Sequence, residues 1–272
     1  MRVRQALAEA ERRLGAVPGH PRQDAELLMA AALAVSIGEM KLRHLDDPTP
    51  AAFEDLLRRR LAREPVAYIV GHCGFWTIEL EVGPGVLIPR ADSETLIEAA
   101  VDHFRGRAPS NIIDLGTGPG TLLLAALDQW PKARGLGVDR SDQALAYARR
   151  NSERLGFAER SDWRLGDWAE GIKGTFDLVL CNPPYIERDA PLDRDVVEWE
   201  PHGALFAGAD GLDDYRRLAP QVDRLVAPGG VACIEIGQGQ EEAVGELFVG
   251  TAFTISSLKD LRGVTRCLVL RR

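Results

Sequence analysis

The chain has 272 residues, of which 45% are hydrophobic, and a formal net charge of −8. This length is sufficient for one large domain and a smaller one. Residues 1–70 carry 11 Lys and Arg against 10 Asp and Glu, so the remainder has a charge of −9, which disfavours sequence-independent DNA binding because that requires cationic side chains to neutralise phosphates.

The first fifteen residues, MRVRQALAEAERRLG, alternate charged and apolar side chains and lack the apolar core of a secretory signal. The longest apolar run nearby, residues 27–35, is about half of what a bilayer span needs. Four cysteines are too widely spaced for a zinc site or a disulfide framework: Cys73, Cys181, Cys233 and Cys267. We therefore expect a cytoplasmic protein with free thiols, no metal and no contact with the membrane.

Apolar residues recur at helical spacing in residues 1–63. The three series are Val3, Leu7, Ala10 and Leu14; Ala25, Leu28, Ala32 and Val35; and Phe53, Leu56, Leu57 and Leu61. Pro and Gly interrupt the pattern at AVPGHP and DDPTP. The pattern predicts a small domain of three or more short helices, which we assign to residues 1–70.

Strand-like alternation begins after Tyr68, in the segment GFWTIELEVGPGVLIPR. Gly83-Pro84-Gly85 interrupts this alternation, as expected for a turn between two strands. The segment predicts a β-hairpin that links the helical domain to the rest of the chain, over residues 71–89.

From residue 90 to residue 272, apolar strand-like segments alternate with helical ones. The strand-like segments are NIIDLG, ARGLGVD, DWRLGDW, FDLVLC, GGVACIEIG, FTISSL and RCLVLRR. This alternation predicts an α/β domain with a mostly parallel sheet covered on both faces. Only KDLRGVT separates the last two segments, so we expect them to pair antiparallel.

The segment DLGTGPG, residues 114–120, follows a predicted strand and opens a predicted helix, where α/β folds bind nucleotides. Gly116, Gly118 and Gly120 allow a ligand to approach the backbone closely and permit positive φ. The dinucleotide fingerprint would need glycine at position 121, which is Thr121, and no P-loop lysine follows. The alternative is a glycine turn without a ligand.

Two further acidic residues follow predicted strands. Asp139 lies where a carboxylate can accept hydrogen bonds from both ribose hydroxyls, although it could instead cap the helix beginning near Ser141. Asp167 and Trp168 could offer a carboxylate to an adenine amine and an indole face for stacking, although Trp168 could also be a core aromatic residue. Together these positions favour a nucleoside pocket for S-adenosylmethionine, since no pyrophosphate cradle is present.

The segment FDLVLCNPPYIERD places Asn182 directly after the fourth strand-like segment. It reads either as a turn that ends a strand or as a site at the carboxyl end of one. Proline fixes its own φ and restricts the residue before it, so the backbone of Asn182, Pro183 and Pro184 is conformationally restricted.

Such a segment can hold a planar NH₂ group. The Asn182 side-chain carbonyl and the Pro183 backbone carbonyl could each accept one of its two protons, and Tyr185 could lie against the flat group. This would align the nitrogen with an electrophilic methyl group, and catalysis would be mainly orientation.

These motifs resemble those of the class I S-adenosylmethionine-dependent methyltransferases that modify peptide chain release factors, the HemK/PrmC family of N5-glutamine methyltransferases. The resemblance covers nearly the whole chain. It rests on REPVAYIVGHCGFW, LIPRADSE, DLGTGPG, GDW, NPPYI, EWEP and EIGQGQ. NPPY alone is shared with other amino-directed methyltransferases, whereas the helical domain joined through EPVAYIVG and IPR is more specific.

The resemblance implies a Rossmann-like, seven-stranded, mostly parallel sheet with an antiparallel last strand. It implies methyl transfer from S-adenosylmethionine, which leaves S-adenosylhomocysteine, to the glutamine of the Gly-Gly-Gln loop of release factors. Matching positions imply cofactor contacts from Gly116, Thr117, Gly118, Pro119, Gly120, Asp139, Asp167, Trp168 and Asn182. They imply that the glutamine is held, and methylation catalysed, at Asn182, Pro183, Pro184 and Tyr185.

The chain departs from the family pattern at two positions. Pro119 could stiffen the glycine loop, and Ala91, where a proline is frequent, could loosen the approach to it. Nearby, Asp92 could cap the next helix and Glu94 could support its positive end, or these residues together with Arg90 could order a lid over the cofactor.

Three other functions compete with release factor methylation. A related enzyme could methylate a glutamine of a ribosomal protein. An amino-directed nucleic-acid methyltransferase would flip a base and would favour a basic face, which the charge of −9 opposes. A non-enzymatic scaffold would bind the cofactor without turnover. We expect a monomer that binds release factors and not DNA.

Overall fold

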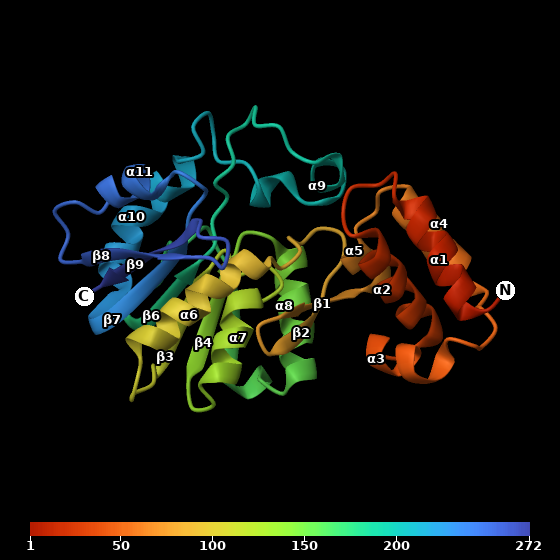
Figure 1. Ribbon diagram of the computed structural model, residues 1–272. Coiled ribbons are helices and arrows are strands. Elements are labelled where there is room, and N and C mark those ends of the chain that lie inside the picture. Colours follow the sequence, from red (N-terminus) through yellow and green to blue (C-terminus); the bar gives the residue numbers. More distant parts are fainter. The chain divides into compact units, whose positions relative to one another are not determined.

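The computed structural model describes residues 1–272 and divides them into two compact units. The helical unit comprises Met1–His72, Val82–Pro84 and Leu192–Glu200. The sheet unit comprises Cys73–Glu81, Gly85–Pro191 and Pro201–Arg272. Figure 1 labels the elements of both units.

The helical unit packs short amphipathic helices around one apolar core. Its elements are α1 (Val3–Leu14), α2 (Pro21–Leu33), α3 (Ile37–Glu39), the π-helical turn η1 (Met40–His44), α4 (Ala52–Leu61), α5 (Val66–Val70) and α9 (Arg194–Trp199). Helix α1 buries Val3, Ala10 and Leu14 of the predicted apolar series. The expectation of a helical N-terminal region is confirmed.

A buried arginine joins α4 to two other parts of this unit. Arg60 is 5% exposed, and its guanidinium contacts Asp24 of α2 and Asp195 of α9, each at 2.8 Å. Arg63 adds a second contact to Asp195 at 3.0 Å. These pairs explain why Leu192–Glu200 packs with helices encoded far upstream, a connection that no pattern in the sequence indicated.

The sheet unit contains seven strands in the order β5-β4-β3-β6-β7-β9-β8. Its strands are β3 (Asn111–Leu115), β4 (Arg134–Asp139), β5 (Ser161–Leu165), β6 (Phe176–Cys181), β7 (Val226–Glu235), β8 (Thr254–Lys259) and β9 (Thr265–Arg271). The pairs from β5 to β7 are parallel, and β9 is antiparallel to both β7 and β8. The predicted α/β fold with an antiparallel last strand is confirmed.

Helices cover the sheet on both faces. They are α6 (Glu94–His103), α7 (Thr121–Gln129), α8 (Asp142–Leu155), α10 (Asp213–Leu225) and α11 (Glu241–Glu246), with short 3₁₀ turns η2 (Ala91–Ser93), η3 (Ala158–Arg160) and η4 (His202–Ala204). Figure 1 shows α6, α7 and α8 on one face and α10 and α11 on the other. Because both faces are covered, the central strands are almost continuously apolar, as in Leu178–Cys181 of β6.

The predicted hairpin exists, but its turn is elsewhere. Strands β1 (His72–Phe75) and β2 (Ile78–Glu81) are joined at Trp76 and Thr77, whereas Gly83-Pro84-Gly85 lies beyond β2. Trp76 adopts a left-handed φ of 54°, and its backbone N–H donates to Glu94 Oε1 at 2.7 Å. A hydrogen bond to a distant carboxylate thus fixes a turn that has no Gly, Asn or Asp.

All four cysteines are free thiols, and all except the half-buried Cys73 are buried. The chain contains no helix that is both long and apolar enough to cross a membrane.

Candidate active site

The candidate site lies where the order of the sheet reverses. From β3 the chain proceeds to β4 on one side and later returns to β6 on the other. Strands β3 and β6 pair with Leu115 opposite Cys181, so the loops that begin at Gly116 and Asn182 leave neighbouring carboxyl ends. Open α/β sheets bind ligands at such switch points. A pocket opens here, lined by both loops.

Backbone hydrogen bonds fix the glycine loop after β3. The N–H groups of Gly116 and Thr117 both donate to the Val138 carbonyl, at 2.9 and 3.0 Å. Gly118 N–H donates to Asp139 Oδ2 at 2.8 Å. The loop is therefore hydrogen-bonded to the end of β4, and helix α7 begins directly after the loop at Thr121.

Glycine is required here for conformation and for space. Gly116, Gly118 and Gly120 have φ values of 72°, 57° and 90°. A Cβ on Gly116 would lie 3.0 Å from the Trp168 ring, and one on Gly120 would lie 2.8 Å from Leu124 Cδ1. Gly116, Thr117, Gly118 and Pro119 line the pocket, whereas Gly120 faces the core side of the turn and does not.

Asp139 also lines the pocket. Its Oδ1 accepts from Ser141 N–H at 2.8 Å, while Oδ2 accepts from Gly118. Burial raises the pKa of Asp139, and the hydrogen bonds from Gly118 and Ser141 oppose this rise. The capping alternative is wrong, because Ser141 caps α8 by accepting from Ala144 N–H at 3.2 Å.

Sequence reasoning did not single out Asp114 as a site residue, although it opens the glycine motif. It is 1% exposed at the pocket wall, and Oδ2 accepts from Thr117 Oγ1 at 2.6 Å and Leu123 N–H at 3.3 Å. Its Oδ1 is buried without a hydrogen-bond partner. Burial raises the pKa of Asp114 to about 7. An acidic residue at the end of the first parallel strand was the available signal.

Asp167 and Trp168 both line the pocket. Trp168 is 8% exposed, has a left-handed φ of 51° and belongs to the apolar core of the sheet unit. Its position in the core is confirmed, and stacking of its ring on a ligand stays a prediction. The Asp167 carboxylate is hydrogen-bonded to Arg217 Nη2. This pairing leaves the carboxylate fewer acceptor positions for an adenine amine than an unpaired group would have.

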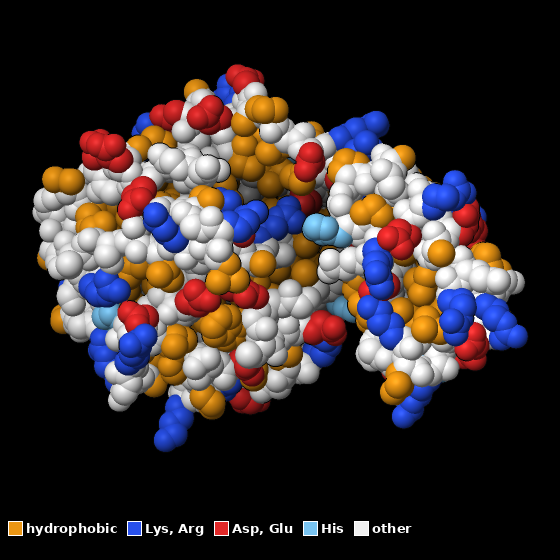
Figure 2. Space-filling model, in the orientation of Figure 1, with side chains coloured by type: hydrophobic (Ala, Val, Ile, Leu, Met, Phe, Trp, Pro, Cys, Tyr) orange, Lys and Arg blue, Asp and Glu red, His pale blue; other side chains and the backbone are white.

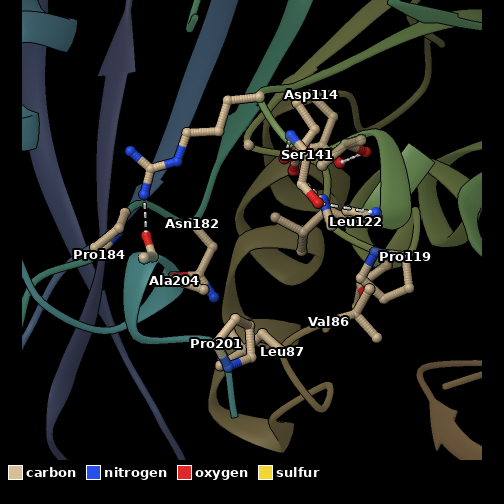
Figure 3. Close-up of a pocket in the computed structure, with 18 of the residues that line it drawn as sticks. Val86, Leu87, Asp114, Pro119, Leu122, Ser141, Asn182, Pro184, Pro201 and Ala204 are labelled. Atoms are coloured by element: carbon tan, nitrogen blue, oxygen red, sulfur yellow. Dashed lines mark hydrogen bonds between the residues drawn. The ribbon is translucent and has the colours of Figure 1, made fainter. Parts of the chain in front are cut away.

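The Asn-Pro-Pro-Tyr segment contributes to the pocket unequally. Asn182 and Pro184 line it, and Figure 3 shows them with Ala204 on one side and Val86, Pro119 and Leu122 on the other. Asn182 Nδ2 donates to Ser93 Oγ at 3.1 Å. Pro183 and Tyr185 are not part of the lining.

Tyr185 is held by partners behind the pocket wall. Its hydroxyl donates to Glu235 Oε1 at 3.2 Å, and its carbonyl accepts from Gln240 Nε2 at 3.0 Å. Burial, and then the charge of Glu235, raise the pKa of Tyr185 far above its ordinary value. Tyr185 therefore supports the segment, and the structure does not place its ring on the pocket surface as the sequence suggested.

Glu235 lies in the EIGQGQ motif, and the sequence did not indicate a role for it. It ends β7, is 1% exposed, and its pKa is raised to about 7 by burial. The nearby Ser93 and Tyr185 hydroxyls oppose this rise. The only signal was a carboxylate at the end of an apolar strand.

The residues before α6 do not act as helix caps. The Asp92 carboxylate pairs with Arg262 at 2.6 Å and Arg266 at 3.0 Å, so the prediction that it caps the helix is wrong. Glu94 lies in the first turn of α6, where it accepts the Trp76 hydrogen bond. Arg90 lines the pocket together with Ser93.

The remaining pocket walls are largely apolar. Val86, Leu87 and Pro89 come from the segment after the hairpin, and Pro201 and Ala204 come from the η4 region. Figure 3 shows Pro201 beside Leu87 at one edge of the pocket. Arg140 donates to the Gly203 carbonyl and so fixes η4.

The residues present fit S-adenosylmethionine. The glycine loop would let a ligand approach the backbone, because Gly118 has no side chain and the space beside it is open. Asp139 offers carboxylate oxygens to ribose hydroxyls, and the unpartnered Asp114 Oδ1 offers an acceptor to a cationic ligand. Apolar walls would exclude water from the remainder.

The fold and this site define a class I S-adenosylmethionine-dependent methyltransferase. The solved structures that it resembles include a methyltransferase from Pyrococcus furiosus, at a TM-score of 0.53 and 16% identity over 80% of this chain and 98% of that one. Another is the ribosomal protein L11 methylase from Lactobacillus delbrueckii subsp. bulgaricus, at a TM-score of 0.50 and 18% identity over 67% of this chain and 80% of that one.

Sequence relatives identify the family. Residues 5–71 match the PrmC N-terminal domain, and residues 108–247 match a methyltransferase domain. The release factor glutamine methyltransferase of Rhodospirillum rubrum is 45% identical over 93% of this chain and 79% of its own length. That of Cereibacter sphaeroides is 40% identical over 100% of this chain and 99% of its own. The chain belongs to the release factor glutamine methyltransferase family.

Proposed function

We propose that this protein transfers a methyl group from S-adenosylmethionine to the side-chain nitrogen of the glutamine in the Gly-Gly-Gln loop of peptide chain release factors. The observation that carries the proposal is the position of Asn182, a stiffly held amide in the wall of the same pocket as the glycine loop. Membership of the family supplies the substrate class.

The substrate amide would be held by acceptors alone. With Nδ2 bound to Ser93, Asn182 has Oδ1 free to accept one proton of the glutamine NH₂ group. The Pro183 backbone carbonyl would accept the other, since no backbone N–H group donates to it. Pro184 would add an apolar contact at the pocket wall.

Orientation in a dry pocket is the main contribution of the chain. The bound cofactor supplies an electrophilic methyl group on its sulfonium. Gly116 to Gly118, Asp139 and Trp168 would hold the cofactor, while Asn182 and Pro183 keep the amide nitrogen in line with that methyl group. An amide nitrogen is a weak nucleophile, so correct placement matters more here than strong base chemistry.

We assign a separate role to each part of the chain. We assign recognition of the release factor to residues 1–70, the link to residues 71–89, and cofactor binding and methyl transfer to residues 90–272. We further propose that the enzyme acts as a cytoplasmic monomer. A native mass near the chain mass of 29.8 kDa would support this state, and twice that mass would contradict it.

An amino-directed nucleic-acid methyltransferase is not favoured. Many cations of the helical unit are already paired, for example Arg13 with Glu54 at 2.9 Å and Lys41 with Glu26 at 2.7 Å. Figure 2 shows Lys and Arg side chains interspersed with Asp and Glu on the visible face of this unit. Phosphate binding would require breaking such pairs.

The test is a methylation assay with methyl-labelled S-adenosylmethionine. Recombinant release factor should be labelled, and a release factor with the Gly-Gly-Gln glutamine changed to alanine should not. Equal labelling of both would reject the proposal. Parallel reactions with a glutamine-containing ribosomal protein and with nucleic acid distinguish the competing enzymes, and cofactor binding without any turnover would indicate the scaffold.

A further inference from the structure

We propose that Ser93 and Glu235 are positioning residues that fix the orientation of the Asn182 amide, and that this orientation lets the site select an amide substrate over a carboxylate. The inference rests on the proposed function, because it deepens the account of how the same pocket recognises glutamine. The residues come from three separate elements: η2, the end of β7 and the loop after β6.

The three groups form a chain in which Asn182 is partly buried and the other two are buried. Asn182 Nδ2 lies 3.1 Å from Ser93 Oγ, and the Ser93 hydroxyl in turn interacts with the Glu235 carboxylate. Ser93 is 2% exposed and Glu235 is 1% exposed. Glu235 Oε1 accepts from Tyr185, whereas Oε2 is buried without a hydrogen-bond partner. Water therefore does not compete for these partners.

The chain has only one consistent arrangement of donors when Glu235 is ionised. A carboxylate can only accept, so it directs the Ser93 proton toward itself and turns the Ser93 lone pairs toward Asn182. Asn182 must then donate from Nδ2 to Ser93. Its Oδ1 consequently faces the pocket, where a substrate would bind.

This orientation matches glutamine and opposes glutamate. Oδ1 can accept a proton from a substrate NH₂ group, but it repels a carboxylate oxygen, which has no proton to donate. If the Asn182 amide turned over, its NH₂ group would face the pocket and would favour a carboxylate. Ser93 and Glu235 thus influence substrate choice without touching the substrate nitrogen.

The kinetic test uses Ser93→Ala, which removes the acceptor, and Glu235→Gln, which can donate to Ser93 as well as accept. We expect each to lower kcat by about tenfold, the scale of one lost buried hydrogen bond, and to leave cofactor affinity within about twofold. Release factor carrying glutamate at the target position should become a better inhibitor. The ratio of its Ki to the KM of the glutamine form should fall about tenfold.

A merely structural role would not change that ratio. Ser93→Thr keeps a hydroxyl and should restore most of the lost discrimination. Ser152→Ala is the matched control: Ser152 is 1% exposed and its hydroxyl lies 2.6 Å from Ser161 Oγ, away from the pocket. A proportional loss of affinity for both forms in Ser93→Ala, with the ratio unchanged, overturns the proposal.

A second measurement does not depend on release factor. The chain has three asparagines, so selective ¹⁵N-asparagine labelling yields three side-chain NH₂ pairs, with that of Asn182 identified by its loss in Asn182→Ala. We expect slow hydrogen exchange at one Asn182 proton in the wild type and faster exchange, by about tenfold, in Ser93→Ala. Asn151, whose Nδ2 donates to Glu81 and Pro119 carbonyls at 3.0 Å, is the internal control.

The two measurements separate the possible failures. If the wild type does not methylate release factor but Asn182 is protected through Ser93, the proposed function fails and the positioning contact stands. If methylation occurs but Asn182 exchange is identical in the wild type and Ser93→Ala, the positioning inference is wrong and the proposed function stands.

Discussion

The two sides of the pocket are built in different ways. The glycine-loop side is fixed by backbone N–H groups that bond to the neighbouring strand end, at Val138 and Asp139. The Asn-Pro-Pro-Tyr side is fixed by side chains: Ser93 holds Asn182, while Glu235 and Gln240 hold Tyr185. The first side is held through its backbone by the next strand along the chain, and the second depends on side chains from more distant parts of the sequence.

This difference separates binding from chemistry. A backbone cradle presents the same groups whatever its side chains do, so it suits a cofactor that is the same in every cycle. Side-chain contacts can discriminate finely between an amide and a carboxylate, and they carry the cost of buried polar groups. If the two sides are as independent as their construction suggests, a change on one side should leave the function of the other intact.

The largest effect concerns the stability cost of the side-chain network. The pKa of Glu235 is raised from 4.5 to about 7 in the folded protein, so the folded state binds more protons than the unfolded state between these values. Stability should therefore fall as pH rises through this window, by about 3 kcal/mol in total. In Glu235→Gln this contribution is absent.

Urea unfolding of the wild type and Glu235→Gln at pH 4.5 and pH 8 measures it. The difference in unfolding free energy between the two proteins should shift by about 3 kcal/mol in favour of the variant at the higher pH. Glu159→Gln, at an exposed glutamate, is the control and should show little shift. A constant difference across pH would mean that Glu235 is not a buried ionising group.

The next prediction removes the amide itself. Asn182→Ala should lower the methylation rate by about 100-fold or more, because the substrate nitrogen loses an orienting contact. Cofactor affinity should change little, since the glycine side is built separately. Single-turnover rates and calorimetric titration with S-adenosylmethionine measure the two quantities, with the exposed Asn111→Ala as control. A normal turnover rate would remove Asn182 from its proposed role.

A smaller effect tests the glycine side. Gly120→Ala should cost about 2 kcal/mol of stability, because it combines a φ of 90° with a Cβ 2.8 Å from Leu124. Gly174→Ala has nearly the same φ, 88°, but open space around its Cβ, so it should cost about 1 kcal/mol. Thermal and urea unfolding of both variants isolates the steric part, and equal losses would show that the turn tolerates a side chain.

The same contrast explains what could be read from the sequence. The glycine loop, Asp139 and the order of strands and helices were predictable because their determinants are contiguous or periodic: DLGTGPG forms its own turn, and apolar runs such as FDLVLC mark buried strands. The position of Asn182 in the pocket wall at the end of β6 was also predictable, because Pro183 and Pro184 restrict the backbone locally.

Features that depend on contacts distant in sequence were not predictable. The Trp76 turn depends on Glu94, the assignment of Leu192–Glu200 to the helical unit depends on Arg60, and the support of Asn182 depends on Ser93. Asp92 was expected to cap a helix because local spacing allowed it, but two arginines from the C-terminal hairpin compete for its carboxylate. Only the folded structure brings such partners together.

The smallest expected effect tests whether the glycine side influences the rate of methyl transfer. In the wild type, Gly118 N–H and Ser141 N–H each donate to one Asp139 carboxylate oxygen at 2.8 Å. Asp139→Asn replaces one of these oxygens with an NH₂ group, which cannot accept. One of the two N–H groups therefore loses its acceptor. Cofactor affinity should fall about tenfold through loosening of the loop and loss of a ribose acceptor. The rate at saturating cofactor should remain within about twofold of the wild type. Asp142→Asn, an exposed carboxylate in the first turn of α8, is the control.

The opposite result would contradict the independence of the two sides of the pocket. If Asp139→Asn bound the cofactor normally but reacted slowly at saturation, the backbone cradle would have to set the position of the methyl group relative to the substrate nitrogen. The glycine loop and the Asn182 amide would then be coupled across the β3–β6 switch point, where Leu115 and Cys181 are direct neighbours. The double variant Asp139→Asn with Asn182→Ala tests this coupling. If the two sides are independent, the losses in activation free energy of the single variants add; if the two sides are coupled, the loss in the double variant is less than their sum.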